Sequence, residues 1–306
     1  MIHRHGPTAA GVDPLLPGAV RIQAFAKVNL FLEVLGRRLD GYHDIATLML
    51  AIDLADELEF TLADAGELSL TCDDPALTVG PENLVLRAAS RLREETGSTL
   101  GVRIHLRKRI PWAAGLGGGS SDAAAALEGL NELWKLGLSP AALARIGATI
   151  GSDVPFFLNG PAAWCTGRGE VIEPAAIGQP LDLVLVKPPA GLATAAVYKR
   201  LKAPAKPESG SVARNALANG EVETLGRALF NRLQEPAFEL EPSVAEIFRQ
   251  VQSSSAAGCL MSGSGSSVFA LCRNSSDARQ VHDDLSRGWA SGGELSPRVF
   301  LVRSRP

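Results

Sequence analysis

Apolar and polar residues alternate with a period of two over much of the first third of the chain. This spacing is typical of strands that bury one face and leave the other in contact with solvent. It predicts strands at residues 21–35, 48–52, 56–62, 67–72 and 102–107. A turn is predicted at Asp40–Gly41, so the chain is expected to open with a largely antiparallel sheet.

Helical periodicity appears between these strands and dominates the middle of the chain. It predicts helices at residues 82–96, 121–136, 140–150, 215–233 and 242–252. The helix at 121–136 is rich in alanine and is followed by Gly137, a residue that often ends helices. Further strands are expected at residues 181–186, 259–261 and 268–272. Residues 202–212, rich in Pro, Lys, Ser and Gly, are expected to form a mobile loop.

The chain has 306 residues, which is enough for two domains of about 150 residues each. Pro and Gly residues gathered at 174–180 mark the expected boundary. We therefore expect an N-terminal extension at residues 1–20, a first domain at 21–175 and a second at 176–306. The extension lacks the apolar core of a secretory signal, so the protein is expected in the cytoplasm.

Charge and cysteine content exclude several classes of protein. Lys and Arg number 30 and Asp and Glu 33, so the formal net charge is −3 and no general attraction for nucleic acid or anionic membranes is expected. No apolar run approaches the ~20 residues that cross a bilayer. The four cysteines stand far apart without a CxxC pair, which argues against a zinc site or a disulfide framework.

The strongest chemical signal is a glycine-rich segment that leads into the helix predicted at 121–136. Its residues are Pro111, Gly115, Leu116, Gly117, Gly118, Gly119, Ser120 and Ser121. Glycine lets the backbone approach a ligand closely, and the unpaired N–H groups of a helix start attract anions. The segment has neither Walker A nor Rossmann spacing. It predicts a phosphate site; the alternative is a turn whose Ser120 or Ser121 caps the helix.

Asp153 is a candidate catalytic carboxylate. It follows the helix predicted at 140–150 and precedes Pro155, whose ring is expected to keep Val154 out of helical geometry. The apolar residues after it would partly shield the carboxylate, which could then take a proton from a hydroxyl or orient it. The alternative is a turn aspartate bonded to its own backbone.

Lys27 and Asn29 interrupt the first predicted strand and, two positions apart, point to the same face. An ammonium and an amide on one face suit a charged ligand, although the solvated face of an edge strand would carry the same pattern. Tyr42 and His43 follow the first turn and could recognise a planar base, or lie on an ordinary surface turn. The Gly/Ser turn at 262–267 could bring N–H groups to phosphates or simply join two strands.

Taken together, these segments resemble the GHMP kinase superfamily, whose members bind ATP through a Pro-x-x-x-Gly-Leu-Gly-type loop instead of Walker A. The resemblance rests on segments in the same order along the chain, at residues 26–32, 40–43, 111–122 and 152–157. It is closest to members that act in the non-mevalonate route to isoprenoid precursors. The turn at 262–267 corresponds to the third glycine motif of the superfamily.

The resemblance implies a fold and a reaction. The fold is α+β, with a mixed β/α N-terminal domain, a ferredoxin-like C-terminal domain and the active site between them. The reaction is phosphorylation by ATP, with Mg²⁺, of the 2-hydroxyl of a cytidine diphosphate derivative of methylerythritol. The chain would be a small-molecule kinase without nucleic-acid or membrane partners, a monomer or a weak homodimer. Its metal ligands are unknown, with Ser121 as a candidate.

The resemblance also implies roles for single residues. Asp153 would activate the substrate hydroxyl, and Lys27 would lie beside it and the transferring phosphate, favouring the ionised carboxylate. Residues 115–121 would hold the ATP phosphates. Substrate contacts are implied for Asn29, Tyr42, His43 and Tyr198. The last three of these would recognise the cytosine by stacking and hydrogen bonding.

One segment departs from the pattern. Where the family often has Asn-Asp-Leu-Glu, this chain has Asn231-Arg232-Leu233-Gln234-Glu235, so no role is carried over to it. Two other functions fit the same motifs: a superfamily kinase that acts on mevalonate derivatives or homoserine, and a nucleotide-binding regulator without turnover. A substrate panel separates the kinases, since only the kinase that acts on the cytidine diphosphate derivative needs cytidine. A purely structural β-rich protein would not require two glycine segments and a polar pair.

Overall fold

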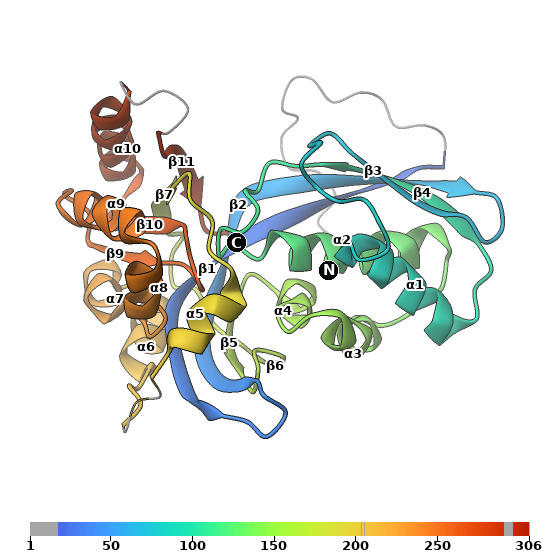
Figure 1. The fold of residues 1–306 in the computed structure, drawn as a ribbon, viewed down its shortest axis with the longest axis horizontal. Coiled ribbons are helices and arrows are strands. Elements are labelled where there is room, and N and C mark those ends of the chain that lie inside the picture. Colours follow the sequence, from blue (N-terminus) through green and yellow to red (C-terminus); the bar gives the residue numbers. More distant parts are fainter. Residues whose placement is uncertain (1–17, 203, 205, 291–295, 306) are drawn as a thin grey trace.

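The computed structural model describes residues 18–202, 204, 206–290 and 296–305. Most of the expected N-terminal extension and two positions of the expected loop at 202–212 therefore lie outside the described residues. The described chain forms two sheets, each with helices against it, and the two halves stand side by side in Figure 1. No helix among the described residues is long and apolar enough to cross a membrane.

The larger sheet is built around two long antiparallel strands, β1 and β2, which carry most of its hydrogen bonds. Its main path runs β3-β4-β2-β1-β8, and β5 pairs with both β2 and β6. β8 comes from far along the chain and lies parallel to β1. The strands are β1 (Val20–Arg37), β2 (His43–Ala63), β3 (Leu68–Cys72), β4 (Gly101–Arg107), β5 (Ala162–Thr166), β6 (Val171–Pro174) and β8 (Phe230–Asn231).

Helices cover one face of this sheet, below it in the view of Figure 1. Phe60 of β2 and Leu106 of β4 pack there against Leu92 and Leu127 of the helices. A Cβ at Gly129 would lie 2.4 Å from the Phe60 ring, so the small residues of α2 let its backbone approach the sheet. The helices are α1 (Leu84–Thr96), α2 (Gly118–Leu133), α3 (Pro140–Ile150) and α4 (Val154–Asn159).

The smaller sheet is antiparallel, with the strand order β11-β7-β10-β9. Numbered along the chain within this sheet, that order is 4-1-3-2, the ferredoxin-like arrangement expected from the sequence. Its strands are β7 (Asp182–Lys187), β9 (Gly258–Met261), β10 (Val268–Cys272) and β11 (Arg298–Arg303). The helices of this half are α5 (Thr194–Arg200), α6 (Ser211–Asn219), α7 (Val222–Ala228), α8 (Gln234–Leu240), α9 (Pro242–Gln252) and α10 (Ser275–Trp289).

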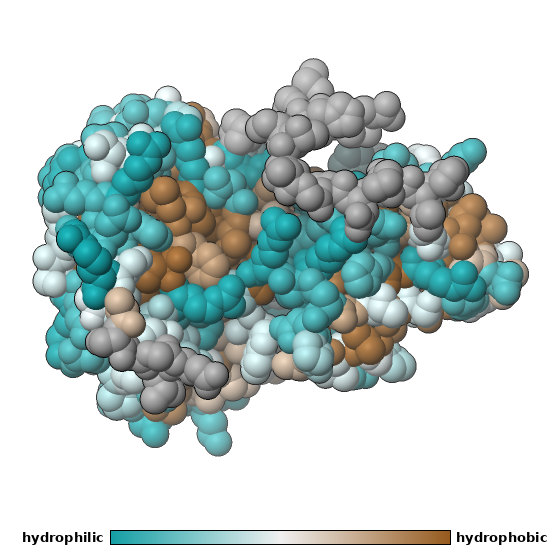
Figure 2. Space-filling model, turned by 90° about the horizontal axis from the view of Figure 1, so that it is seen from above, coloured by the Kyte–Doolittle hydropathy of each residue, from teal (hydrophilic) through white to brown (hydrophobic). Residues whose placement is uncertain are grey.

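Both faces of the smaller sheet are buried, which fixes how the two halves meet. Along β7, Leu183 and Leu185 pack in one core with Leu30 of β1. The alternate residue Val184 packs in a second core, which includes Val251 of α9. One face of the smaller sheet therefore packs against the larger sheet, and its other face packs against helices. The surface seen from above is largely hydrophilic, with separate apolar areas (Figure 2).

Most predicted elements are present, and the α+β fold is confirmed, but some boundaries were wrong. The helix predicted at 215–233 is α6 and α7, broken at Gly220 with φ 73°, followed by β8. The strands predicted at 48–52 and 56–62 are one continuous strand, β2. Apart from β8, the strands of the larger sheet end along the chain with β6, and those of the smaller sheet begin with β7. The exact domain boundary at residue 175 stays a prediction.

Candidate active site

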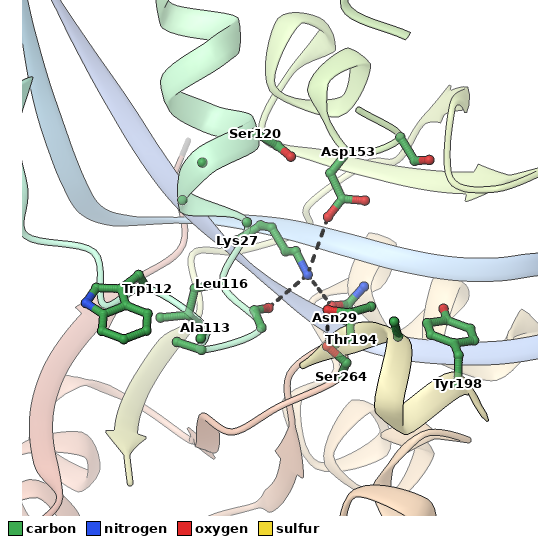
Figure 3. A pocket seen from close by; sticks show the side chains of 18 of the residues that line it. Lys27, Asn29, Trp112, Ala113, Leu116, Ser120, Asp153, Thr194, Tyr198 and Ser264 are labelled. Carbon is green, nitrogen blue, oxygen red and sulfur yellow. Dashed lines mark hydrogen bonds and ion pairs between the residues drawn. The ribbon is translucent and has the colours of Figure 1, made fainter. Parts of the chain in front are cut away.

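A cavity of about 1170 Å³ is lined by residues from both halves of the chain. The predicted site residues that line it are Lys27, Asn29, Tyr42, His43, Pro111, Gly115, Leu116, Gly117, Gly118, Gly119, Ser120, Asp153 and Tyr198. Ser121 is not among its lining residues and is buried in α2. Residues distant in sequence thus converge on one space (Figure 3).

The Lys27 side chain projects from β1 toward Asp153 (Figure 3). Its Nζ donates to Asn29 Oδ1 at 2.7 Å and to Gly115 O at 2.9 Å, and lies 3.8 Å from Asp153 Oδ2. Burial lowers the pKa of Lys27, and the charge of Asp153 opposes that shift. A buried ammonium therefore stands beside both a carboxylate and the glycine-rich segment.

The amide of Asn29 has its orientation fixed by neighbouring strands. Asn29 Nδ2 donates to Thr47 Oγ1 at 2.8 Å, and the Thr47 hydroxyl donates to Phe31 O at 2.7 Å. With the nitrogen so engaged, the amide oxygen is left to accept from Lys27. Lys27 and Asn29 share one face of β1 as predicted, but both are buried, so the alternative of a solvated edge strand is wrong.

Helix α2 begins at Gly118, earlier than the sequence predicts. Gly117 precedes it with φ 70°, and no side chain caps the helix start, so the alternative that Ser120 or Ser121 caps it is wrong. The first N–H groups of a helix have no acceptor within it, and the positive end of the helix dipole lies at the same place. Because these residues line the cavity, they can bind a phosphate group.

Two glycines in this segment leave no space for a side chain. A Cβ at Gly117 would lie 2.9 Å from the Phe157 ring, and one at Gly115 would lie 2.0 Å from Ser262 O. The Ser262 hydroxyl also donates to Gly115 O at 2.9 Å. The Gly/Ser turn at 262–267 is therefore packed onto the first glycine segment, and Gly115 O bonds to both Ser262 and Lys27.

Asp153 immediately precedes the short helix α4, and its side chain is 29% exposed. Val154 is the first residue of that helix, so the expectation that Pro155 keeps it out of helical geometry is wrong. Proline fits the first helical turn, where its missing N–H costs no hydrogen bond. The buried Phe156 follows, and the carboxylate is partly shielded from water as expected.

Aromatic rings gather in another part of the cavity lining. The His43 ring stacks on Tyr198 with centroids 5.1 Å apart, and the Arg168 guanidinium lies 5.0 Å from the centroid of Tyr42. Burial lowers the pKa of His43, and the charge of Arg37 acts in the same direction. A neutral imidazole both donates and accepts hydrogen bonds, which suits a nucleobase edge.

The lining also contains charged groups that sequence reasoning missed. Lys108 Nζ lies 2.5 Å from Asp56 Oδ2 and 2.9 Å from Asp122 Oδ2. Burial raises the pKa of Asp122 to about 8, partly opposed by the charge of Lys108. Asp122 Oδ1 is buried without a hydrogen-bond partner among the described residues. Acidic residues within otherwise apolar runs were the signal that could have located this cluster.

Two other lining residues, Trp112 and Thr194, were also not predicted. Trp112 lies within the glycine-rich segment and is 60% exposed, although large aromatic side chains are usually more buried. The hydroxyls of Thr194 and Ser264 lie 2.9 Å apart (Figure 3). Thr194 is the first residue of α5, which was not predicted, so no motif pointed to it.

Comparison with known proteins agrees with this geometry. The family described as GHMP kinases N terminal domain matches residues 83–161, and the one described as GHMP kinases C terminal matches residues 213–291. The 4-diphosphocytidyl-2-C-methyl-D-erythritol kinase of Pelotomaculum thermopropionicum is 47% identical over 84% of this chain and 91% of its own length. The protein of the same name from Shouchella clausii is 43% identical over 92% and 93%.

Solved structures give the same result. The crystal structure of a 4-(cytidine 5'-diphospho)-2C-methyl-D-erythritol kinase superposes with a TM-score of 0.76 at 36% identity, covering 94% of this chain and 100% of that chain. A homoserine kinase from Cytophaga hutchinsonii superposes with a TM-score of 0.72 at 21% identity over 93% and 94%, which shows a shared fold. From these matches and the site geometry, the chain belongs to the 4-diphosphocytidyl-2-C-methyl-D-erythritol kinase family of the GHMP kinases.

Proposed function

We propose that this small-molecule kinase transfers the γ-phosphoryl group of ATP to the 2-hydroxyl of 4-diphosphocytidyl-2-C-methyl-D-erythritol, in the non-mevalonate pathway of isoprenoid precursor synthesis. The family of the chain supports this reaction. The observation that carries it is that Lys27, Asp153 and the start of α2 line one cavity that also contains the aromatic pair His43 and Tyr198.

The phosphates of ATP bind at the glycine-rich segment in this proposal. The N–H groups of Gly118 and Gly119 open the helix at a lining position, where the helix dipole favours negative charge. The Lys27 ammonium adds a full positive charge beside them. Together these groups stabilise the charge that develops on the transferring phosphoryl group.

Asp153 accepts the proton of the substrate hydroxyl. The hydroxyl oxygen forms a bond to the γ-phosphorus, and the bond from that phosphorus to the oxygen bridging it to the β-phosphate breaks. The products are ADP and the 2-phosphate of the substrate, with the hydroxyl proton on the Asp153 carboxylate. The Lys27 ammonium, 3.8 Å from Asp153 Oδ2, places a positive charge beside the carboxylate that takes the proton.

The cytosine binds among the aromatic side chains. Tyr42 is 56% exposed and Tyr198 lines the cavity from α5, so both offer a ring face to a planar base. The neutral imidazole of His43 can donate to or accept from its polar edge. Asn29, held by Thr47, contacts the substrate from β1.

The oxygen donors of the site fit Mg²⁺, which binds few protein groups and keeps contacts to phosphates and water. No group of three or more His, Cys, Asp and Glu side chains suited to a metal occurs among the described residues. The Ser120 hydroxyl lies on the same side of Lys27 as Asp153 (Figure 3), and we propose that it holds the ion together with the ATP phosphates and water. When bound, Mg²⁺ would neutralise charge on the β- and γ-phosphates.

Purified protein with ATP, Mg²⁺ and the cytidine-bearing substrate should produce ADP and the 2-phosphate. Asp153→Asn should lower kcat by about 10²–10⁴-fold, the usual effect of removing a catalytic proton acceptor. Asp64→Asn, a substitution of the same kind at an exposed position, should leave kcat unchanged. Turnover retained by the Asp153 variant would remove that residue from its role.

A substrate panel tests the choice of acceptor. Homoserine and mevalonate should give no product above background, because neither carries a cytidine for Tyr42, His43 and Tyr198. Turnover of either one in preference to the cytidine-bearing substrate would contradict the proposed function. ATP binding in calorimetry, without phosphoryl transfer to any acceptor, would instead indicate a nucleotide-binding regulator.

A further inference from the structure

The end of β8 makes a buried contact with the Gly/Ser turn at 262–267. Asn231 is 6% exposed, and its Nδ2 donates to Met261 O at 2.7 Å and to Gly263 O at 2.8 Å. Its Oδ1 accepts from Leu233 N at 2.9 Å. Both N–H groups of the amide and its oxygen are thus engaged, so the side chain has one fixed orientation.

Gly263 lies directly against Lys27 and Asn29. Its φ is 56°, and a Cβ on it would lie 3.2 Å from Lys27 Nζ and 3.4 Å from Asn29 Oδ1. Gly263 lines the cavity, whereas Asn231 does not. The Gly263 carbonyl is therefore held by a group outside the cavity, although its α-carbon is packed against the ammonium within it.

The direction of that carbonyl matters because an ammonium has only three N–H donors. Two of them are engaged by neutral acceptors, Asn29 Oδ1 and Gly115 O. Asp153 Oδ2, at 3.8 Å, is beyond hydrogen-bond distance, so the third is available for the transferring phosphoryl group. A peptide carbonyl is a strong acceptor and, turned toward Lys27, would take this third proton.

We infer that Asn231 is a positioning residue for Lys27, an inference that rests on the proposed function. By holding Gly263 O outside the cavity, Asn231 leaves the third ammonium proton free for the phosphoryl group in the transition state. We place the effect on the chemical step because Asn231 lies outside the cavity and bonds to the carbonyl of Gly263, which is packed against Lys27.

The neighbouring Gln234 offers a matched control. Its Oε1 accepts from Met261 N at 3.1 Å, so it joins the same segment to the same strand end without touching Gly263 O. Both side chains bond to the main chain of Met261, so a loss of general packing against the end of β9 would affect variants at both positions. A change in the direction of the Gly263 carbonyl would lower kcat only in the Asn231 variants.

The experiment compares Asn231→Ala, Asn231→Asp and Gln234→Ala with the unchanged protein in steady-state kinase assays. Asn231→Asp keeps the size of the side chain but replaces its donors with an acceptor. Both Asn231 variants should lose about tenfold to hundredfold in kcat, with the KM values for ATP and the cytidine-bearing substrate within about threefold. Gln234→Ala should keep its kcat within about twofold.

Calorimetry with a nonhydrolysable ATP analogue checks that each variant retains a folded site. If Asn231→Asp does not bind the analogue, the kcat of Asn231→Ala is used to test the inference. An unchanged kcat in a variant that binds the analogue overturns the inference, as does a loss expressed only in KM or an equal loss in Gln234→Ala. Absence of turnover in the unchanged protein instead refutes the proposed function, so the two failures are distinguishable.

Discussion

Lys27 Nζ lies 3.8 Å from Asp153 Oδ2, although one residue belongs to β1 and the other precedes α4. The distance allows attraction between the charges without a direct hydrogen bond. Burial disfavours the ammonium form of Lys27, and the negative charge of Asp153 opposes this effect. A proton acceptor and a positive charge are thereby kept within reach of one phosphoryl group.

Replacing Lys27 by methionine tests its catalytic role against a structural one. We expect kcat to fall at least about a hundredfold, because a preorganised positive charge is lost. The free energy of unfolding should also fall, by about 1–3 kcal/mol, because the buried Asn29 Oδ1 loses its donor. Steady-state kinetics and denaturant titration measure the two effects.

Lys187→Met provides the control for that prediction. Lys187 is also buried and also donates to two main-chain carbonyls, Pro188 O and Ala190 O, but it does not line the cavity. Its substitution should leave kcat within about threefold of the unchanged protein. Equal losses in both variants would mean that Lys27 acts through folding alone.

Gly117→Ala should weaken ATP binding more than the backbone strain of a positive φ alone would. Its φ of 70° is costly for alanine, and the added Cβ would lie 2.9 Å from the Phe157 ring. Gly137 has a similar φ of 67° but open space around it, so Gly137→Ala has the strain without the clash. We expect the KM for ATP to rise at least about tenfold only in the first variant. Matching kinetics in the two variants would contradict a phosphate role for Gly117.

Tyr198→Ala should weaken binding of the cytidine-bearing substrate. Stacking of a base on an aromatic side chain contributes about 1–3 kcal/mol, so the KM for that substrate should rise about fivefold to a hundredfold. The KM for ATP should not change, and Tyr198→Phe should keep nearly full affinity because the ring remains. A rise in the KM for ATP alone would place the base site elsewhere.

Asp122 should make the protein less stable as the pH rises. Its pKa of about 8 in the folded protein lies well above the ordinary value of an aspartate, so the folded state holds a proton there that the unfolded state has lost. The stabilising contribution is complete below pH 4 and declines as the pH rises toward and through 8. Between pH 5 and 9, the Tm of Asp122→Asn should therefore fall less than the Tm of the unchanged protein. The difference should be about 2–4 °C for each kcal/mol of pH-dependent stability that the substitution removes.

The groups that face Asp122 are Lys108 and Asp56, and both must be considered in that experiment. Burial disfavours the charged form of Lys108, but its contacts with Asp122 and Asp56 outweigh burial and raise its pKa, so Lys108 remains charged across this pH range. Asp64→Asn, at an exposed position, should reproduce the slope of the unchanged protein. An identical slope in Asp122→Asn would show that its carboxyl does not retain the proton.

Motifs with a local physical cause were predicted well from the sequence. The glycine segment at 115–119 precedes a helix because alanine and leucine follow it, and Lys27 and Asn29 share a face because strand side chains alternate. These features need no knowledge of the remainder of the fold. That they line one cavity, however, depends on contacts between segments far apart in sequence.

Features determined by tertiary contacts were missed. The helix predicted at 215–233 has a suitable composition throughout, but Phe230 and Asn231 pair with Phe31 and Leu32 of β1 and leave helical geometry. Asn231 itself has no signal in its own neighbourhood, because its partners Met261 and Gly263 are distant in sequence. Sequence periodicity describes a segment by itself and contains no information on such pairs.

The two residues of β8 have a consequence for attempts to divide the protein. They pair with Phe31 and Leu32 of β1, so the second half of the chain completes one edge of the larger sheet. A fragment that stopped at residue 175 would leave main-chain groups there unpaired, and exposed strand edges recruit other chains. Expressed alone, the first half would tend to aggregate, and the two halves are best produced as one polypeptide.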